Sequence, residues 1–382
     1  MHIMNVIYFD NAASTKVRED AIEVMLSVMR DEYGNPSSSH FLGRMASARL
    51  SAARENVAAA LGAAPDEVYF TSGGTESDNW AVLGAAELMS RKGRHIITSH
   101  IEHEAVLQTV KKLEHSGWDV TYLSPDNSGR ISEDSFAAAL REDTVLASVM
   151  LVNNETGALN PVGLYAREIR RRKLDTILHT DAVQGFCKIP FSVRTLGADL
   201  VTVSAHKIHG PKGAGALFMR AGTKLPPLLL GGGHENGKRS GTEALPAIAG
   251  FGEAARLGRA EMQENSANAR TIREYIAGRI CGELPGAFQI GDGDSPFLLN
   301  ISLPGYKSEV LMNYLEGEGI CVSKGSACKK GARSRVLVAM SLKDDVIDGA
   351  LRLSFGRYNT IGEAERFCEV LKKASETLLK TL

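Results

Sequence analysis

Short apolar runs rich in β-branched residues recur along the first part of the chain and alternate with segments of helical periodicity. The apolar runs predict strands at residues 6–9, 68–70, 95–99, 120–123, 145–151, 176–180, 200–203 and 215–219. Helical spacing of apolar positions predicts helices at about 18–29, 43–61 and 79–90, and another up to about 114. Strands that alternate with helices are typical of a parallel, doubly wound α/β sheet.

The pattern changes beyond residue 218. A glycine-rich, basic loop spans 231–242, and one long helix is predicted from about 246 to 277. The remaining residues mix helices with strands at 297–303, 320–323 and 351–355. This mixture indicates a smaller α+β domain.

Composition narrows the class of protein. The 382 residues carry 44 Lys and Arg against 45 Asp and Glu, a net charge of −1, which points to neither nucleic acid nor an anionic membrane. No apolar run approaches the length of a membrane span, and the N-terminal stretch lacks the regions of a signal peptide. The five cysteines match no disulfide framework or CxxC site, so we expect a reduced, cytoplasmic setting.

Two predicted strands end in residues suited to pyridoxal phosphate (PLP) chemistry. Lys207 follows the strand at 200–203, and a desolvated lysine amine is the usual protein partner of an aldehyde. Asp181 follows the strand at 176–180, and a carboxylate against the pyridine nitrogen would keep the ring protonated. Ligands of open α/β sheets bind at the carboxyl ends of the strands. A surface lysine in a turn and an aspartate helix cap are the alternatives.

A phosphate group has two candidate binding segments. Gly73, Gly74 and Thr75 separate a strand from a helix, where backbone N–H groups and the helix dipole favour an anion. Thr75 and Asp78 also fit a capping box, and both interpretations can hold together. The loop 231–242 offers N–H groups, cations and hydroxyls, although a plain flexible loop would look the same.

His100 and His103 follow the strand at 95–99 with a spacing that a metal site could use. No cysteine or third ligand lies nearby at metal-site spacing, so the sequence favours no metal. A flat imidazole at a strand end can instead stack on an aromatic cofactor.

One cysteine differs from the others in its surroundings. Cys328 lies between Gly325 and Gly331 in a loop with four cations, and nearby positive charge favours the nucleophilic thiolate. An incidental exposed cysteine is the alternative. We expect the remaining four to be packed among apolar elements: Cys187, Cys281, Cys321 and Cys368.

A set of motifs in order extends over nearly the whole chain: FDNAAST, YGNPSSSHFLGR, FTSGGTESDN, HIITSHIEHEAVL, VNNETG, TDAVQG, VSAHKIHGPKGAGAL, GGGHENGKRSGT, GSAC and LRLSFGR. Together they resemble the PLP-dependent cysteine desulfurases of the NifS/IscS group, in the class-V aminotransferase family. The resemblance implies a PLP-dependent transferase fold of type I, arranged as a homodimer. Its large domain, at 16–255, would hold a mostly parallel seven-stranded sheet. Residues 1–15 and 256–382 would form the small domain, which carries the cysteine loop.

The resemblance also implies residue roles. Lys207 would bind PLP covalently as an internal aldimine and later act as general base, His103 would stack on the ring, and Cys328 would accept sulfur. The other implied contacts are Asp181 to the ring nitrogen, Asn154 and Gln184 to the phenolic oxygen, Gly74, Thr75, Ser204 and His206 to the phosphate, Thr242 to the phosphate bound by the partner subunit, and Asn35 and Arg352 to the substrate carboxylate.

The implied reaction converts L-cysteine to L-alanine and leaves a persulfide on Cys328. The sulfur would pass to an acceptor protein for iron–sulfur cluster assembly or for thiolation of tRNA or cofactors. Two differences from the family pattern bear on the identity of the sulfur acceptor. The loop after Cys328 is shorter and more basic than in housekeeping members, and the chain ends soon after Lys380, where an extension is usual.

Two other functions stay open at this point. One is another PLP enzyme of the same fold type, such as an aminotransferase or a selenocysteine lyase; the GSAC motif argues against an aminotransferase. The other is a non-catalytic dimeric scaffold. The presence of Lys207, Asp181, His103 and Arg352 argues against a scaffold.

Overall fold

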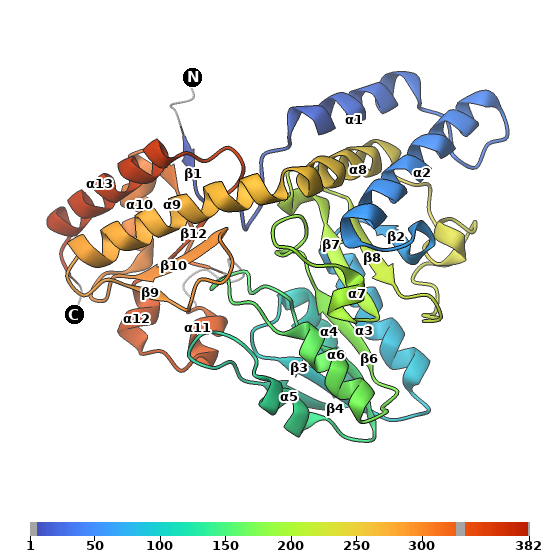
Figure 1. The fold of residues 1–382 in the computed structure, drawn as a ribbon, viewed down its shortest axis with the longest axis horizontal. Helices are drawn as coiled ribbons and strands as arrows, with labels where there is room; N and C mark the ends of the chain where they lie inside the picture. The colour runs from blue at the N-terminus through green and yellow to red at the C-terminus, as the bar shows by residue number, and fades with distance from the viewer. Residues whose placement is uncertain (1–5, 326–332, 381–382) are drawn as a thin grey trace.

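The computed structural model describes residues 6–325 and 333–380. Its largest sheet has seven strands in the order β2-β8-β7-β6-β5-β3-β4 (Figure 1). These strands are β2 (Val68–Thr71), β3 (His95–Ser99), β4 (Asp119–Leu123), β5 (Thr144–Ser148), β6 (Ile177–Asp181), β7 (Leu200–Ser204) and β8 (Gly215–Met219). Strand β8 runs antiparallel to both β2 and β7, whereas the other neighbouring pairs are parallel. The prediction of a mostly parallel seven-stranded sheet is confirmed.

Helices cover both faces of this sheet. The apolar sides of α3 and α4 pack on one face, around Trp80 and Val106. A second core on the other face includes Val57, Tyr165 and Phe251 from α2, α6 and α8. The helices of this part are α1 (Glu19–Asp31), α2 (Phe41–Leu61), α3 (Gly74–Met89), α4 (Glu104–His115), α5 (Glu133–Ala139), α6 (Val162–Arg171), α7 (Val193–Leu196) and α8 (Leu245–Ala260), with short 3₁₀ turns η1 (Pro65–Glu67), η2 (Ala205–Lys207) and η3 (Glu235–Gly237).

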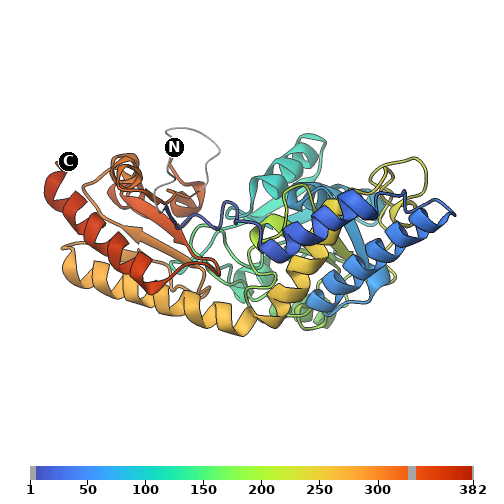
Figure 2. The same ribbon diagram turned by 90° about the horizontal axis from the view of Figure 1, so that it is seen from above.

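A smaller antiparallel sheet, in the order β12-β10-β9, lies beside the large one with both chain termini on its side (Figures 1 and 2). Its core joins Phe9 to residues of α9 and α13, because β1 pairs with β11 and brings the N-terminal segment across. The elements here are β1 (Ile7–Tyr8), α9 (Met262–Glu283), β9 (Phe288–Ile290), β10 (Leu298–Ser302), α10 (Ser308–Gly317), β11 (Ile320–Cys321), α11 (Arg335–Ala339), α12 (Asp344–Asp348), β12 (Ala350–Ser354) and α13 (Ile361–Thr377). The division into domains at 15/16 and 255/256 stays a prediction.

The single helix predicted from 246 to 277 is wrong, because the chain forms two helices, α8 and α9, that meet at Glu261. The Glu261 carboxylate accepts two hydrogen bonds from the guanidinium of Arg18, at 3.0 and 3.2 Å, and pairs with Arg357 at 3.2 Å. These partners come from distant parts of the chain, so local periodicity carries no sign of the break. Within the described residues, none of the helices has the length and apolarity that a bilayer crossing requires.

Candidate active site

A cavity of about 360 Å³ opens where the large sheet meets the small one. It lies at the carboxyl ends of β6 and β7, and helices α3 and α4 begin beside it. The predicted site residues that line it are Gly74, Thr75, His103, Asn154, Asp181, Gln184, Ser204, His206, Lys207 and Arg352. Residues separated by long stretches of sequence therefore share one enclosed space, as ligand sites of open α/β sheets do.

The amine of Lys207 lies in η2, immediately after β7, inside this cavity. Its Nζ donates to the backbone carbonyls of Ala12 at 2.6 Å and Ala13 at 2.8 Å, and both acceptors belong to the N-terminal segment. Burial lowers the pKa of Lys207 to about 8, and the charge of Arg352 acts in the same direction. A larger neutral fraction near physiological pH makes this amine a better nucleophile than an ordinary lysine.

Asp181 ends β6 and is 6% exposed, and its Oδ1 accepts from the backbone N–H of Val183 at 2.9 Å. Burial raises its pKa, while His103 and Lys207 act in the opposite direction. Asp78, on α3, also lines the cavity and is fully buried. Burial and the charge of Asp181 raise the pKa of Asp78 well above its usual range. Of the two carboxyls, Asp181 has the cationic neighbours His103 and Lys207, which oppose the rise in its pKa and suit it to partner a cationic group.

The sequence interpretation treated Asp78 only as a capping residue and missed its place in the cavity. Oδ1 of Asp78 lies 3.6 Å from Nε2 of the buried His179, and the Thr202 side chain opposes part of the rise in the pKa of Asp78. Burial lowers the pKa of His179 to about 3, so that ring is neutral. The apolar residues around Asp78 on its helix are a sequence sign that its carboxyl is buried. Only the tertiary structure shows that this carboxyl lies near Asp181.

The start of α3 forms one end of the cavity and fits a phosphate group. The helix begins at Gly74, several residues earlier than the predicted 79, and Gly74 and Thr75 of its first turn line the cavity. A Cβ at Gly74 would lie 3.1 Å from Cγ2 of Val183, so the backbone approaches closely here. The Ser204 hydroxyl is buried, and residues 6–325 and 333–380 offer it no hydrogen-bond partner. An unpartnered donor beside helix N–H groups matches the need of an anion.

Two imidazoles near this end have different environments. His206 lines the cavity, its Nδ1 lies 3.3 Å from Oγ of Ser14, and burial lowers its pKa to about 4. His103 caps α4 through Nδ1, which accepts from the N–H of Ala105 at 3.2 Å, and its exposed ring is available to a flat ligand. The ring of His100 instead stacks on Tyr122, with centroids 5.4 Å apart. The two histidines of the HxxH pattern therefore have separate partners, although Asp78, His103 and Asp181 place ligand atoms within 4.8 Å of one another.

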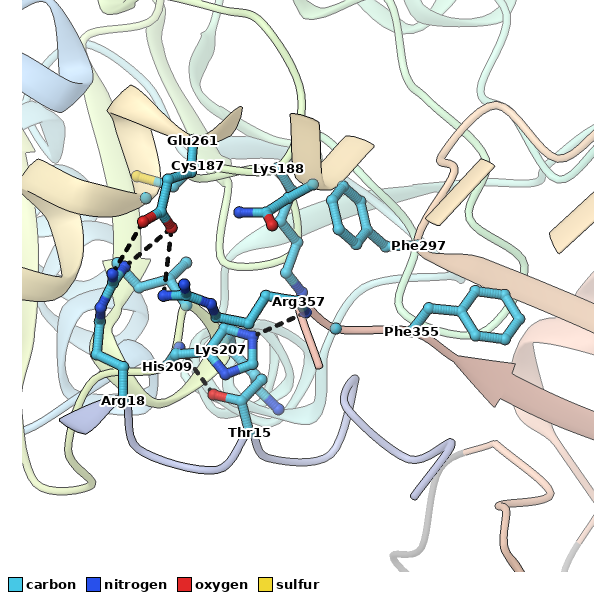
Figure 3. A pocket seen from close by; sticks show the side chains of 14 residues that line it. Thr15, Arg18, Cys187, Lys188, Lys207, His209, Glu261, Phe297, Phe355 and Arg357 are labelled. Carbon is cyan, nitrogen blue, oxygen red and sulfur yellow. Dashed lines mark hydrogen bonds and ion pairs between the residues drawn. The ribbon is translucent and has the colours of Figure 1, made fainter. Parts of the chain in front are cut away.

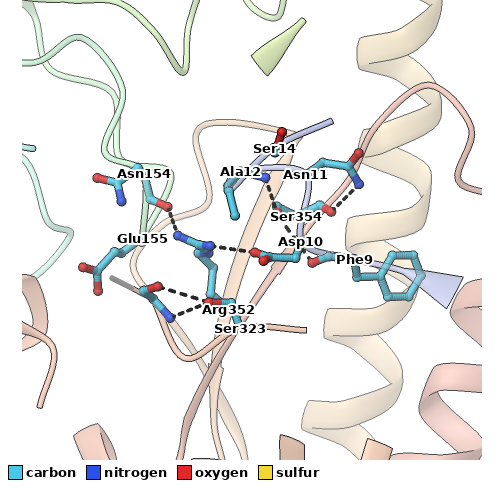
Figure 4. Close-up of polar contacts among 12 residues, drawn as sticks. Phe9, Asp10, Asn11, Ala12, Ser14, Asn154, Glu155, Ser323, Arg352 and Ser354 are labelled. Carbon is cyan, nitrogen blue, oxygen red and sulfur yellow. Dashed lines mark hydrogen bonds and ion pairs between the residues drawn. The ribbon is translucent and has the colours of Figure 1, made fainter. Parts of the chain in front are cut away.

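Arg352 reaches the cavity from β12 of the small sheet. Its Nη2 donates to Oδ1 of Asp10 at 2.7 Å and its Nη1 to the carbonyl of Asn154 at 3.1 Å (Figure 4). The side chain is 4% exposed, and among the residues that the structure describes its Nε has no hydrogen-bond partner. Sequence reasoning missed Asp10, although it quoted the motif that contains this residue. A guanidinium held by one carboxylate, with an N–H group to spare, is suited to a second carboxylate.

Asn35 and Thr242 do not line the cavity formed by this chain. Oδ1 of the exposed Asn35 accepts from the N–H of Ser37 at 2.8 Å, in the loop between α1 and α2. Thr242 is exposed in the glycine-rich loop, whose Arg239 pairs with Glu76 at the start of α3. The roles predicted for Asn35 and Thr242 stay predictions.

Cys328 lies outside the described residues, but the residues on both sides of 326–332 are placed. Gly325 lines the cavity, and Arg335 donates to the carbonyl of Glu102 at 2.7 Å, next to His103. Two of the four cations proposed to lower the thiol pKa are engaged elsewhere: Lys324 pairs with Glu309 at 2.5 Å, and Arg333 pairs with Asp344 and Asp348 at 2.6 and 2.7 Å.

The prediction that the other four cysteines are packed among apolar residues is wrong for Cys281, which is exposed on α9. The apolar stripe of α9 that faces the small sheet runs through Ile272, Ile276 and Ile280, so the next residue points away from the core. Cys368 is buried, and Cys187 and Cys321 are partly buried. Burial raises the pKa of Cys187 and Cys368 to about 12.

Comparison with known proteins agrees with this geometry. Residues 7–367 match the family described as aminotransferase class-V. A relative named cysteine desulfurase IscS, from Methanosarcina thermophila, is 40% identical over 97% of this chain and 92% of its own. One named cysteine desulfurase, from Nostoc sp., is 41% identical over 98% of this chain and 94% of its own.

Solved structures give the same result. A structure titled NifS-like protein has a TM-score of 0.93 and 38% identity, and the match covers 98% of this chain and 100% of the other. A structure titled SspA in complex with cysteine has a TM-score of 0.81 and 34% identity, with 93% of this chain and 100% of the other covered. The chain therefore belongs to the class-V aminotransferase family and, within it, to the group of the cysteine desulfurases.

Proposed function

We propose that the protein uses PLP to remove sulfur from L-cysteine, yielding L-alanine and a persulfide on Cys328. One observation carries the proposal. The cavity joins a lysine amine of lowered pKa, a buried aspartate and a buried arginine, and the residues that precede the Cys328 segment line the same space. An aminotransferase needs the first three groups but no loop thiol.

The residues of the cavity fit PLP by their chemistry. Lys207 would hold the aldehyde carbon, Asp181 the protonated ring nitrogen, and His103 the face of the ring. Asn154 and Gln184 would hold the phenolic oxygen, while Gly74, Thr75, Ser204 and His206 would hold the phosphate. When bound, PLP supplies an electron-withdrawing ring that stabilises negative charge at the substrate's Cα.

Substrate binding and proton transfer fall to this chain's own side chains. Arg352 would take the substrate carboxylate, with Asp10 keeping the guanidinium in place. The amine of Lys207, whose pKa is about 8, is suited to take the Cα proton and to return a proton later. Because the part of the cavity wall formed by Asp181 and Ser204 is buried, water screens charges there less than at an exposed surface.

The sulfur step balances with Cys328 as acceptor. Its thiolate forms a bond to the substrate's sulfur as the substrate's carbon–sulfur bond breaks, and the carbon keeps the electron pair and gains a proton. The products are L-alanine and Cys328–S–SH. A reductant or an acceptor protein then removes the outer sulfur, and that acceptor would serve iron–sulfur cluster assembly or thiolation.

Incubation with L-cysteine and a thiol reductant tests the proposal. We expect L-alanine and sulfide in equal amounts, both dependent on PLP. A keto acid without sulfide would indicate an aminotransferase, and a strong preference for selenocysteine would indicate a selenocysteine lyase. A protein that neither binds PLP nor consumes cysteine would contradict the proposal.

Asp181→Asn tests the ring contact. We expect this variant to keep some cofactor and to lose activity by at least about a hundredfold, because the amide cannot hold a proton on the ring nitrogen by its charge. Cofactor content from visible absorbance and kcat are measured on the same sample. Near-normal turnover at full PLP content would mean that another group performs this task.

Thr242 tests the proposed homodimer, because it is exposed and absent from its own chain's cavity. We expect a dimer on sedimentation, and Thr242→Ala to weaken PLP binding by about tenfold through one lost hydrogen bond. Mixing Thr242→Ala with Lys207→Ala subunits should restore activity, since a hybrid dimer has one site with both residues intact. A fully active monomer would contradict the arrangement.

A further inference from the structure

Lys188 is a buried lysine to which the proposed reaction gives no task. It is 7% exposed and belongs to the turn that follows β6, four residues after Gln184. Within the described residues, no carboxylate pairs with Lys188, and its Nζ lies 6.0 Å from the centroid of the Phe297 ring. Burial lowers the pKa of Lys188 to about 7, and the charges of Lys207 and Arg352 add to the effect. Burial of an amine costs free energy unless the amine has a hydrogen-bond partner, so the partner of Lys188 indicates its role.

The contact of Lys188 is with Gln184. The lysine Nζ donates to Oε1 of Gln184 at 3.0 Å, and Nε2 of the same amide donates to the carbonyl of Ala12 at 3.0 Å. The carbonyl of Ala12 also accepts from Lys207 at 2.6 Å. A chain of hydrogen bonds therefore connects Lys188 to the amine that the proposed function uses. Lys188 and Lys207 also line one small cavity, of about 30 Å³ (Figure 3).

These partners fix which way the Gln184 amide points. The protonated Lys188 amine has no acceptor and a backbone carbonyl has no donor. Turning the amide over would place its NH₂ group against the Lys188 amine and its oxygen against the oxygen of Ala12. Both contacts would then be unfavourable, so the observed orientation is the one that the neighbours select. The second N–H bond of Nε2 is left for the main cavity, which Gln184 lines.

We propose that Lys188 is a positioning residue that holds the Gln184 amide with its N–H toward the phenolic oxygen of the cofactor. This inference rests on the proposed function, because it requires PLP in the cavity. Without Lys188 the amide can turn over and present its oxygen to the cofactor's oxygen. The result would be the loss of one donor and, in the turned state, a repulsion between two acceptors.

Lys188→Met removes the donor and keeps the length of the apolar stem. We expect the dissociation constant of PLP, measured by titration of the apoprotein, to rise about tenfold, the loss of one hydrogen bond. We also expect the pH midpoint of the bound cofactor's visible band to rise by up to about one pH unit. The donor stabilises negative charge on the phenolic oxygen, so its loss disfavours the high-pH form.

Three controls separate positioning from structural damage. Lys188→Arg keeps a donor and should restore both quantities toward the wild-type values, and Lys224→Met, which removes an exposed lysine, should change neither. Gln184→Leu removes the group through which Lys188 is proposed to act. Adding Lys188→Met to Gln184→Leu should therefore change PLP affinity by less than about twofold.

Wild-type PLP affinity and a wild-type pH midpoint in Lys188→Met would overturn the inference. An equal loss of PLP affinity from Lys188→Met in the wild-type and in the Gln184→Leu background would also overturn it. Thermal unfolding of the apoprotein checks that each variant folds, and Lys188→Ala serves as the donor-free variant if Lys188→Met does not. A wild-type protein that fails to bind PLP would refute the proposed function itself. A wild-type protein that binds PLP beside an unaffected Lys188→Met variant would refute this inference alone.

Discussion

Lys207→Ala is expected to lower turnover of L-cysteine by more than about 10⁴-fold, because one substitution removes both the covalent attachment of PLP and the proposed base. PLP should still bind, since the start of α3 and the hydroxyl of Ser204 would hold its phosphate. Borohydride reduction of the wild-type protein, followed by peptide mapping, should place the label on Lys207. Lys207→Arg is the matched control: it keeps a cation in the cavity but cannot form the link.

The pH dependence of this attachment follows from the lowered pKa of Lys207, which is about 8. A lowered pKa means that the neutral, nucleophilic amine predominates above about pH 8, whereas an ordinary lysine needs a pH above about 10.4. The rate at which apoprotein takes up PLP should therefore rise with pH and level off near 8. A rise that continues beyond pH 10 would contradict the lowered pKa.

Lys188 is a second amine that could react with PLP in the borohydride experiment. It lines the small cavity with Lys207, and its pKa is also lowered, to about 7. Its amine is engaged by Oε1 of Gln184 at 3.0 Å, whereas the amine of Lys207 lies in the main cavity. A reduced label on Lys188, Lys212 or Lys224 would refute the assignment of Lys207.

Cys328→Ala is expected to bind L-cysteine normally and to lower sulfide release by at least about 10³-fold, because the sulfur then has no acceptor. Binding should persist since Arg352 and Lys207 are unchanged. Absorbance changes on adding cysteine report the binding, and sulfide and alanine report the turnover. Release of sulfide at the wild-type rate would show that the enzyme expels sulfur without the loop thiol.

Mass spectrometry after a brief pulse of L-cysteine locates the persulfide in the wild-type protein. We expect the added sulfur on Cys328. The exposed Cys281 is the competing site that the structure reveals, so Cys281→Ser is the matched control and should retain both the persulfide and full activity. Burial raises the pKa of Cys321, which disfavours its thiolate. A persulfide confined to Cys281 or Cys321 would contradict the role of Cys328.

The sequence alone predicts the large sheet and the polar residues at the carboxyl ends of its strands. Apolar runs of strand length end in Asp181 and in the segment of Lys207, and parallel strands bring their carboxyl ends to one edge. The signal is local, because each polar residue directly follows its own strand. The signal of Gly73 and Gly74 is equally local, since they are the N-cap and the first residue of α3.

Only the tertiary structure decided which groups surround those residues. Asp10 meets Arg352 across 342 positions of sequence, and Asp78 on α3 approaches Asp181 at the end of β6. The break between α8 and α9 coincides with ion pairs from Arg18 and Arg357 to Glu261. Periodicity reports which face of an element is buried, whereas these contacts depend on how the buried faces of separate elements pack together.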